Sequence, residues 1–251
     1  MKTLTRMIPL LALALAGPAI AQSNAPATFE RLRVKTQEMP FFPFELIQLG
    51  VREGQVCVAF STDVAGKVDD CLAVAYTHRD FARVAVNAVR HWTFEAARLS
   101  GQPIASASEV IFNFEVQGTV VVSLTPSESL SVWMNRLHHL DESYYPRSLR
   151  ELDRIPTPIA TPSPVYSPAL AQRGHVGDVS VNFYIDETGT VRLPAVESGS
   201  DPELAALAIT AIQNWKFEPP TCRGQAVLTK TNQIFRFRPT GATAGATAVK
   251  S

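Results

Sequence analysis

The sequence repeats itself at a fixed offset of 123 residues, and this repeat constrains the fold more than any other feature. The offset separates Trp92 from Trp215, which lie in the phrases HWTFEAA and NWKFEPP. It needs no gap from Gly54 to Phe114, because glycines, alternating valines and spaced alanines recur in the same order over 177–237. A period this long indicates a duplicated domain and not a solenoid of short repeats. We therefore expect two small domains in tandem.

Each copy has the pattern of a β-hairpin, a helix and a closing strand. The stretch GDVSVNFYIDETGTV alternates apolar and polar residues, which is typical of a strand with one buried face. Gly189 suits the tight turn that follows, and Gly66 is its counterpart in the first copy. Apolar residues and small alanines at helical spacing then predict a helix that ends at each tryptophan. We expect four aromatic residues to be structural, filling the joint between helix and sheet: Trp92, Phe94, Trp215 and Phe217.

The expected fold class is therefore α+β, with two tandem small two-layer α/β sandwiches. The outward-facing residues of the first hairpin strand are small in the first copy: Cys57, Ala59 and Ser61. Their counterparts in the second copy are larger and more polar. We expect the outer sheet face of the first domain to be partly covered, with a helix around Trp133 as one candidate, and that of the second domain to be open. Thr119 to Leu124 is expected to extend the last strand of the first copy.

The N-terminus has the pattern of a secretory signal peptide. Lys2 and Arg6 precede an apolar run from Ile8 to Ile20, and small residues end at Ala21, where we expect cleavage. The mature chain would then be periplasmic. The alternative is an uncleaved inner-membrane anchor, which the run of about 13 residues is short to provide, since about 20 are needed to cross a bilayer.

Six segments follow from these patterns. They are a signal peptide at 1–21, an N-terminal segment at 22–40, a diverged domain at 41–124, a helix plus proline-rich linker at 125–165, a second domain at 166–239 and a disordered tail at 240–251.

Composition argues against several functions. Hydrophobic residues make up 46% of the chain, enough for two cores, while charged residues make up 18% and the net charge is zero. This balance gives no electrostatic reason to expect nucleic acid. No phosphate-binding loop or nucleophile motif is present, so we expect no enzymatic activity, no cofactor and no small-molecule substrate.

One cluster has the composition of a metal site: His138, His139, Asp141 and Glu142. Adjacent histidines on a helix point about 100° apart and rarely share one ion, so we expect no metal. A metal-dependent hydrolase around His138 remains a distant alternative.

Two of the cysteines, Cys57 and Cys71, flank the predicted hairpin turn of the first copy. A disulfide between them is conceivable in an oxidising compartment, and two free thiols are the alternative.

The second copy resembles the C-terminal domain of TonB and TonB-like energy transducers. The resemblance rests on Tyr166, Gly174 and Gly177, on VSVNFYIDETGTV and LAALAITAIQNWKFEPP, and on Gly224 and the closing IFRF. The first copy, from Phe42 to Phe114, resembles a more diverged member. Ser167 stands where the family usually has a proline. The uncleaved N-terminal helix and long proline-rich spacer of the energy transducers are not visible, so the resemblance covers the domains alone.

The resemblance implies a three-stranded sheet under one helix, whose free edge pairs with an extended segment of an outer-membrane transporter. We therefore expect a non-enzymatic periplasmic module that binds envelope proteins, TonB-dependent outer-membrane receptors among them. The rival is a membrane-anchored TonB-type transducer. The last strand, from 227 to 238, is the expected binding edge, through Thr229, Thr231, Gln233, Phe235 and Arg236. Its cations could instead protect the edge from pairing.

Overall fold

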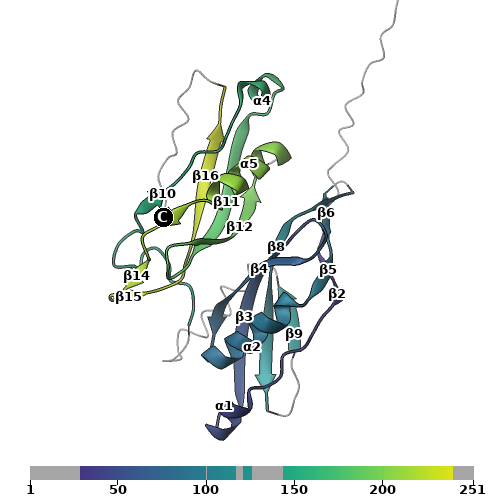
Figure 1. Cartoon of the computed structure of the whole chain (residues 1–251), viewed down its shortest axis with the longest axis vertical. Helices are drawn as coiled ribbons and strands as arrows, with labels where there is room; N and C mark the ends of the chain where they lie inside the picture. The colour runs from purple at the N-terminus through teal and green to yellow at the C-terminus, as the bar shows by residue number, and fades with distance from the viewer. Residues whose placement is uncertain (1–28, 100, 117–120, 126–143, 200, 240–251) are drawn as a thin grey trace, which may run out of the picture.

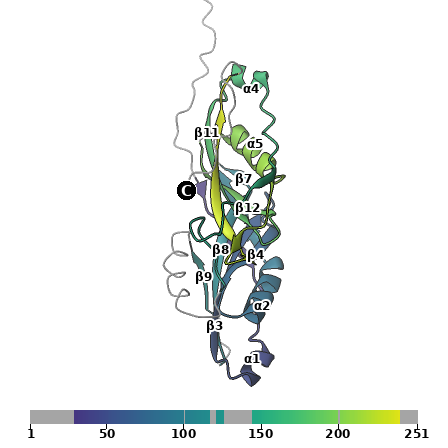
Figure 2. The same ribbon diagram turned by 90° about the vertical axis from the view of Figure 1, so that its left-hand side faces the viewer.

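The computed structural model describes residues 29–239 except 100, 117–120, 126–143 and 200, and these residues form two domains (Figure 1). The predicted signal peptide, the helix around Trp133, the cluster at His138 and the C-terminal tail lie outside the described residues. Each domain is a sheet with one main helix, and Figure 2 shows both helices on the same side of the molecule. The predicted α+β class and the two repeated units are confirmed.

The first domain is built on a four-stranded sheet with the order β4-β3-β8-β9. Its strands are β3 (Glu53–Thr62), β4 (Val68–Tyr76), β8 (Ser106–Glu115) and β9 (Val121–Thr125). Helix α2 (Arg79–Arg90) packs on one face, and α1 (Phe44–Gln48) precedes β3. Smaller strands at the domain's margin are β1 (Phe29–Glu30), β2 (Arg33–Thr36), β5 (Thr93–Glu95), β6 (Ala97–Leu99) and β7 (Gln102–Ile104).

The second domain has a three-stranded sheet with the order β12-β11-β16. Its strands are β11 (Gly177–Ile185), β12 (Val191–Ser198) and β16 (Thr229–Phe237), and its helix is α5 (Pro202–Ile212). The remaining elements are β10 (Pro158–Ala160), α4 (Pro168–Gln172), β13 (Lys216–Phe217), β14 (Thr221–Cys222) and β15 (Gln225–Ala226). All pairs between these strands are antiparallel, and β11–β12 and β14–β15 are hairpins of consecutive strands.

The two main helices begin at side chains that cap them. Asp201 accepts hydrogen bonds from the backbone N–H groups of Glu203 and Leu204 at the start of α5, where Pro202 occupies the first turn. His78 accepts one from the N–H of Asp80 at the start of α2. Buried alanines on each helix, such as Ala85 and Ala208, leave room for the aliphatic and aromatic side chains of the sheet.

The repeated W-x-F phrase joins helix to sheet in both domains. Trp92 and Trp215 are buried, and their indole N–H groups donate to the backbone carbonyls of Glu38, at 2.8 Å, and Pro162, at 3.0 Å. Both acceptors lie in the segment that enters the domain. Each tryptophan therefore ties the end of its helix to the start of its domain, which is an architectural role.

The hairpin glycines complete the same joint. Phe217 donates its backbone N–H to the carbonyl of Gly189 at 2.9 Å, and Phe94 does the same to Gly66 at 2.8 Å. Both glycines have φ near +80°, and a Cβ on either would lie within 2.0 Å of the carbonyl oxygen of its phenylalanine partner. Only glycine fits this contact, because the conformation and the space both exclude a side chain.

Segments expected to lie outside the domains take part in them. In the predicted N-terminal segment, β2 pairs with β5 and β1 with β6, so this segment forms part of the first domain. In the predicted linker, β10 pairs with β13, and Glu218 donates its N–H to the carbonyl of Thr157 at 2.8 Å. Extended, proline-rich chain can still pair where an individual residue keeps its carbonyl or amide free.

The outer faces of the two sheets share a third apolar cluster. It joins Cys57, Ala59, Val74, Ala75 and Ile111 of the first domain to Tyr184, Leu193 and Leu228 of the second. The expected covering of the first domain's outer face is confirmed, but the second domain provides it. The expectation of an open outer face on the second domain is wrong there, because Tyr184 is buried in the same contact.

The two candidate disulfide partners are free thiols on opposite faces of the first sheet. Cys57 belongs to the cluster between the domains, whereas Cys71 packs beneath α2 with its Sγ 3.9 Å from the carbonyl oxygen of Val86. Side chains on opposite faces of a sheet cannot meet without disrupting it. The conceivable disulfide is therefore absent, and the free-thiol alternative describes the structure.

Candidate functional site: the open edge of the second sheet

Strand β16 lies at the margin of the second sheet (Figure 1). It pairs along its whole length with β11, from Thr229 opposite Ile185 to Phe237 opposite Gly177. On its other side, the described residues form a single pairing, which is an isolated parallel bridge between Arg147 and Thr229. Beyond that bridge, the edge from Lys230 onward has no strand beside it within the described chain.

The bridge shows which backbone groups point to the open side. Arg147 donates its N–H to the carbonyl of Leu228 at 2.8 Å, so the peptide groups of Leu228 face away from β11. Successive residues of a strand direct their backbone groups to alternate sides, and the pairing with β11 has no register shift. The N–H and C=O groups of Asn232, Ile234 and Arg236 therefore point to the open side.

This alternation corrects the expected set of edge residues. Thr229, Thr231, Gln233 and Phe235 direct their backbone groups toward β11, so of the five residues expected, Arg236 alone directs its backbone to the open side. The side chain of Phe235 is buried in the core, and the hydroxyl of Thr229 donates to the carbonyl of Arg147 at 2.7 Å. The sequence pattern located the strand, and its pairing decides which residues a partner could reach.

One side chain of the strand already uses an outward carbonyl. The amide Nε2 of Gln233 donates to the backbone carbonyl of Ile234 at 2.9 Å. This contact lies within the strand itself, so an incoming strand that donates to the same carbonyl would share it with Gln233 or replace it. The Ile234 N–H is not involved in this bond and stays directed to the open side.

The corresponding edge of the first domain is occupied. Strand β9 pairs antiparallel with β8, from Glu109 opposite Thr125 to Asn113 opposite Val121. Adding the repeat offset of 123 to residues 109–113 gives residues 232–236, which is the open part of β16. Among the described residues, the equivalent edge is therefore paired with another strand of the chain in the first copy and is unpaired in the second.

Strand β9 also corrects the expectation that Thr119 to Leu124 extends the last strand. β8 ends at Glu115, and Val121–Thr125 returns alongside it as a separate strand. Gly118 between the two apolar runs is the sequence signal that could have indicated this return, since glycine is frequent in hairpin turns.

The proline-rich segment before α4 leaves the edge of β16 unpaired. Among the described residues, no backbone hydrogen bond joins residues 158–167 to β16. The segment is held elsewhere: Pro162 accepts from Trp215, and the hydroxyl of Tyr166 donates to the carbonyl of His175 at 2.7 Å. Prolines have no N–H to offer, which favours this arrangement.

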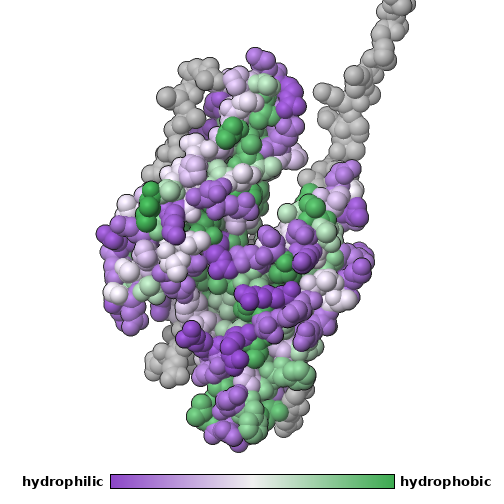
Figure 3. Space-filling model, in the orientation of Figure 1, coloured by the Kyte–Doolittle hydropathy of each residue, from purple (hydrophilic) through white to green (hydrophobic). Residues whose placement is uncertain are grey.

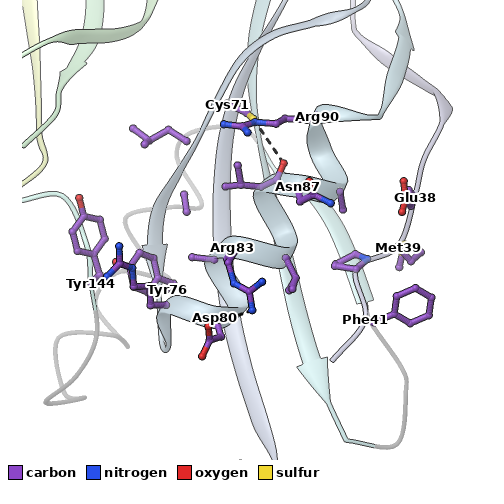
Figure 4. Close-up of a pocket in the computed structure, with 18 of the residues that line it drawn as sticks. Glu38, Met39, Phe41, Cys71, Tyr76, Asp80, Arg83, Asn87, Arg90 and Tyr144 are labelled. Atoms are coloured by element: carbon purple, nitrogen blue, oxygen red, sulfur yellow. Dashed lines mark hydrogen bonds and ion pairs between the residues drawn. The ribbon is translucent and has the colours of Figure 1, made fainter. Parts of the chain in front are cut away.

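Two other surfaces are open to solvent but lack the groups of a reactive site. A groove of about 870 Å³ lies around α2 and β4 and contains Cys71, Arg83 and Arg90 (Figure 4). Arg83 there already pairs with Asp80 at 3.5 Å. An apolar patch lies over α1 at the end of the first domain, where Phe44 is exposed (Figure 3). Within the described residues, neither surface presents a nucleophile with an adjacent base.

Among the described residues, no group of three or more His, Cys, Asp or Glu side chains could hold a metal ion. Within the same residues, no helix combines the length and the apolar character needed to span a membrane.

Comparison with known proteins identifies the duplicated unit. Residues 39–116 and 162–239 both match the family model for the Gram-negative bacterial TonB protein C-terminal, and together they are more than half of the chain. The chain belongs to the TonB C-terminal family. The predicted two copies are confirmed, and membership relates the chain to envelope transport.

A similar solved structure is the solution NMR structure of the Pseudomonas aeruginosa TonB C-terminal domain, with 26% sequence identity. The match covers 39% of this chain and 97% of that chain, with a TM-score of 0.32. A search of curated proteins finds no match.

Proposed function

We propose that this TonB-family chain is a non-enzymatic periplasmic module that captures an extended segment of an envelope protein on the open edge of β16. The observation that carries the proposal is the contrast between the copies: β9 lies on the edge of β8, while the equivalent stretch of β16 has no strand beside it in the described chain. An added strand would pair with the outward backbone groups of Asn232 and Ile234, which is the physical basis of strand addition.

The pairing of β9 with β8 supports the idea that the edge of the last strand can accept an added strand. The first domain shows that the fold tolerates one more strand beside its last one, with both sets of backbone groups paired. The pairing also implies that the two domains have different roles, because the edge of β8 is already occupied by β9 and cannot receive another strand. The second domain is then the capture site and the first domain its support.

The proposed partners are envelope proteins, with TonB-dependent outer-membrane receptors as the leading class, since the family acts in envelope transport. The proposed location is the periplasm, after removal of the signal peptide behind Ala21. A membrane-anchored transducer is the alternative, and N-terminal sequencing of the exported protein separates the two: a chain that begins at Gln22 supports the periplasmic form.

A pull-down from envelope extract tests strand addition. Ile234→Pro removes an N–H on the open side of β16 while leaving the hydrogen bonds to β11 in place. Ile234→Val is the matched control, because it keeps the N–H and the side chain's branched shape. We expect the proline variant to lose the partners that the native chain and the valine variant retain. A folded proline variant that captured the same partners would refute strand addition at this edge.

A further inference from the structure

A cavity of about 380 Å³ lies between the two domains, on the outer face of the second sheet. Ser108 and Glu109 of β8 line it from the first domain, and Asn182, Tyr184, Glu197 and Lys230 line it from the second. Its volume is in the range of small-ligand pockets. The cavity exists because the domains pack around it, so neither domain alone would form it.

Glu109 is the unusual residue of this cavity. Its side chain is only 8% exposed to solvent, yet Oε2 has no hydrogen-bond partner among the described residues. Oε1 accepts from the hydroxyl of Tyr184 at 3.3 Å and lies 3.8 Å from Nζ of Lys230. A buried carboxylate oxygen without a donor is costly, and burial raises the pKa of Glu109 because it disfavours the ionised form. Oε2 is therefore suited to accept from a donor that enters the cavity and stabilises the carboxylate.

The charges around the cavity define that partner. Two carboxylates, Glu109 and Glu197, face one ammonium, Lys230, which leaves an excess of negative charge when all three are ionised. Ser180 donates to Glu197 at 2.9 Å, so this second carboxylate already has a partner from its own sheet. The acceptor without a donor is therefore Oε2 of Glu109, and a positively charged N–H donor would form its hydrogen bond and offset the remaining negative charge of the cavity.

A divalent metal ion fits the cavity less well. Calcium takes six to eight oxygen ligands and magnesium six. The described residues contain no group of three acidic, histidine or cysteine side chains in metal-binding range. An ammonium or guanidinium group needs fewer acceptor oxygens than a divalent metal ion, and its N–H groups can donate directly to Oε2 of Glu109.

We propose that this interdomain cavity binds a primary ammonium or guanidinium group, with Oε2 of Glu109 as its main acceptor. Such a group can come from a small free cation or from a lysine or arginine side chain of a bound protein. Both sources offer the same chemistry to Glu109. The proposal does not depend on strand addition at β16.

Calorimetric titration of the full chain tests it with two probes. Methylguanidinium represents a free cation, and acetyl-Gly-Arg-Gly-amide represents a side chain on an extended backbone. We expect at least one probe to bind, and Glu109→Gln to weaken that binding by about tenfold or more, because the amide keeps the shape and removes the charge. Binding of both probes indicates access for a protein side chain, and binding of methylguanidinium alone indicates a free cation.

Glu115→Gln is the matched control, since Glu115 lies on the same strand and the same face as Glu109 but is exposed and outside the cavity. We expect it to bind like the native chain. In the native chain itself, the side-chain carboxyl carbon resonance of Glu109 should shift on adding the probe, which keeps the test informative if Glu109→Gln fails to fold. No binding of either probe, equal binding by the Glu109→Gln variant, or tighter binding of Mg²⁺ than of both probes would overturn the proposal.

Discussion

Arg192 of the second domain donates two hydrogen bonds to Asp70 of the first, from Nε to Oδ2 at 2.9 Å and from an Nη to Oδ1 at 2.5 Å. Both side chains are partly buried, and the carboxylate of Asp70 raises the pKa of Arg192 further above its ordinary value. This pair flanks the apolar cluster in which β12 lies against the first sheet. The domains are thus joined by packing and by a charge pair, in addition to the covalent chain.

Asp70→Asn should loosen the contact between the domains. The amide can accept only one of the two hydrogen bonds, and it removes the nearer of the two carboxylates beside Arg192, the other being Asp186 at 3.7 Å. We therefore expect a loss of about 1–3 kcal/mol of unfolding free energy. Urea unfolding measures this loss, and small-angle scattering measures any change in the spacing of the domains. Asp69→Asn is the control, because Asp69 is exposed on the same strand. Equal stability of the two variants would show that the pair contributes nothing to docking.

Gly189→Ala should destabilise the second domain by at least about 3 kcal/mol. The new Cβ would lie 1.9 Å from the carbonyl oxygen of Phe217, at a φ of +81°. Gly224→Ala is the matched control, since φ there is +75° and a Cβ at that position would have no neighbour within 4 Å among the described residues. The control should cost about 1–2 kcal/mol, from the left-handed conformation alone. Thermal unfolding of the two variants compares them, and similar melting temperatures would contradict the role of close contact.

Amide hydrogen exchange should distinguish the two sheet edges in the free protein. The N–H groups of Ile111 and Asn113 face β9, so we expect them to be protected. Those of Asn232 and Ile234 face the open side and should exchange rapidly. Equal protection at the two edges would mean that β16 is covered. Proline substitution offers a second comparison: Ile111→Pro should lower the melting temperature more than Ile234→Pro, because it removes both a donor that β9 uses and an apolar side chain buried between the domains, whereas Ile234 is exposed.

Thiol labelling should follow burial. Burial raises the pKa of the Cys57 thiol and of the Cys71 thiol, so both carry less thiolate than an exposed cysteine at the same pH. We expect Cys222, which is partly exposed, to react first with a thiol reagent in the native protein. After unfolding in the absence of reductant, which would leave any disulfide intact, we expect all three cysteines to react. Detection of a single reactive thiol after such unfolding would indicate a disulfide.

Local sequence patterns specified the folding unit and the number of copies. The offset of 123 residues, the alternation along the hairpin strand and the alanine spacing on the helix are properties of neighbours in the chain, so they could be read directly. They predicted two α+β domains, and the resemblance of the second copy to the TonB C-terminal domain indicated the family. They also indicated that Trp215 and Phe217 mark the end of a helix, because Pro219 and Pro220 follow.

Packing between distant segments set what each domain presents to a partner. The same strand position is open in the second copy and covered by β9 in the first, and a strand's partner depends on residues far from it in the chain. The direction of each backbone group of β16 follows from its register with β11, which made Ile234 and not Thr231 the residue facing outward. The burial of Glu109 likewise arises where the domains meet, because contacts between folded surfaces depend on shape that local patterns do not specify.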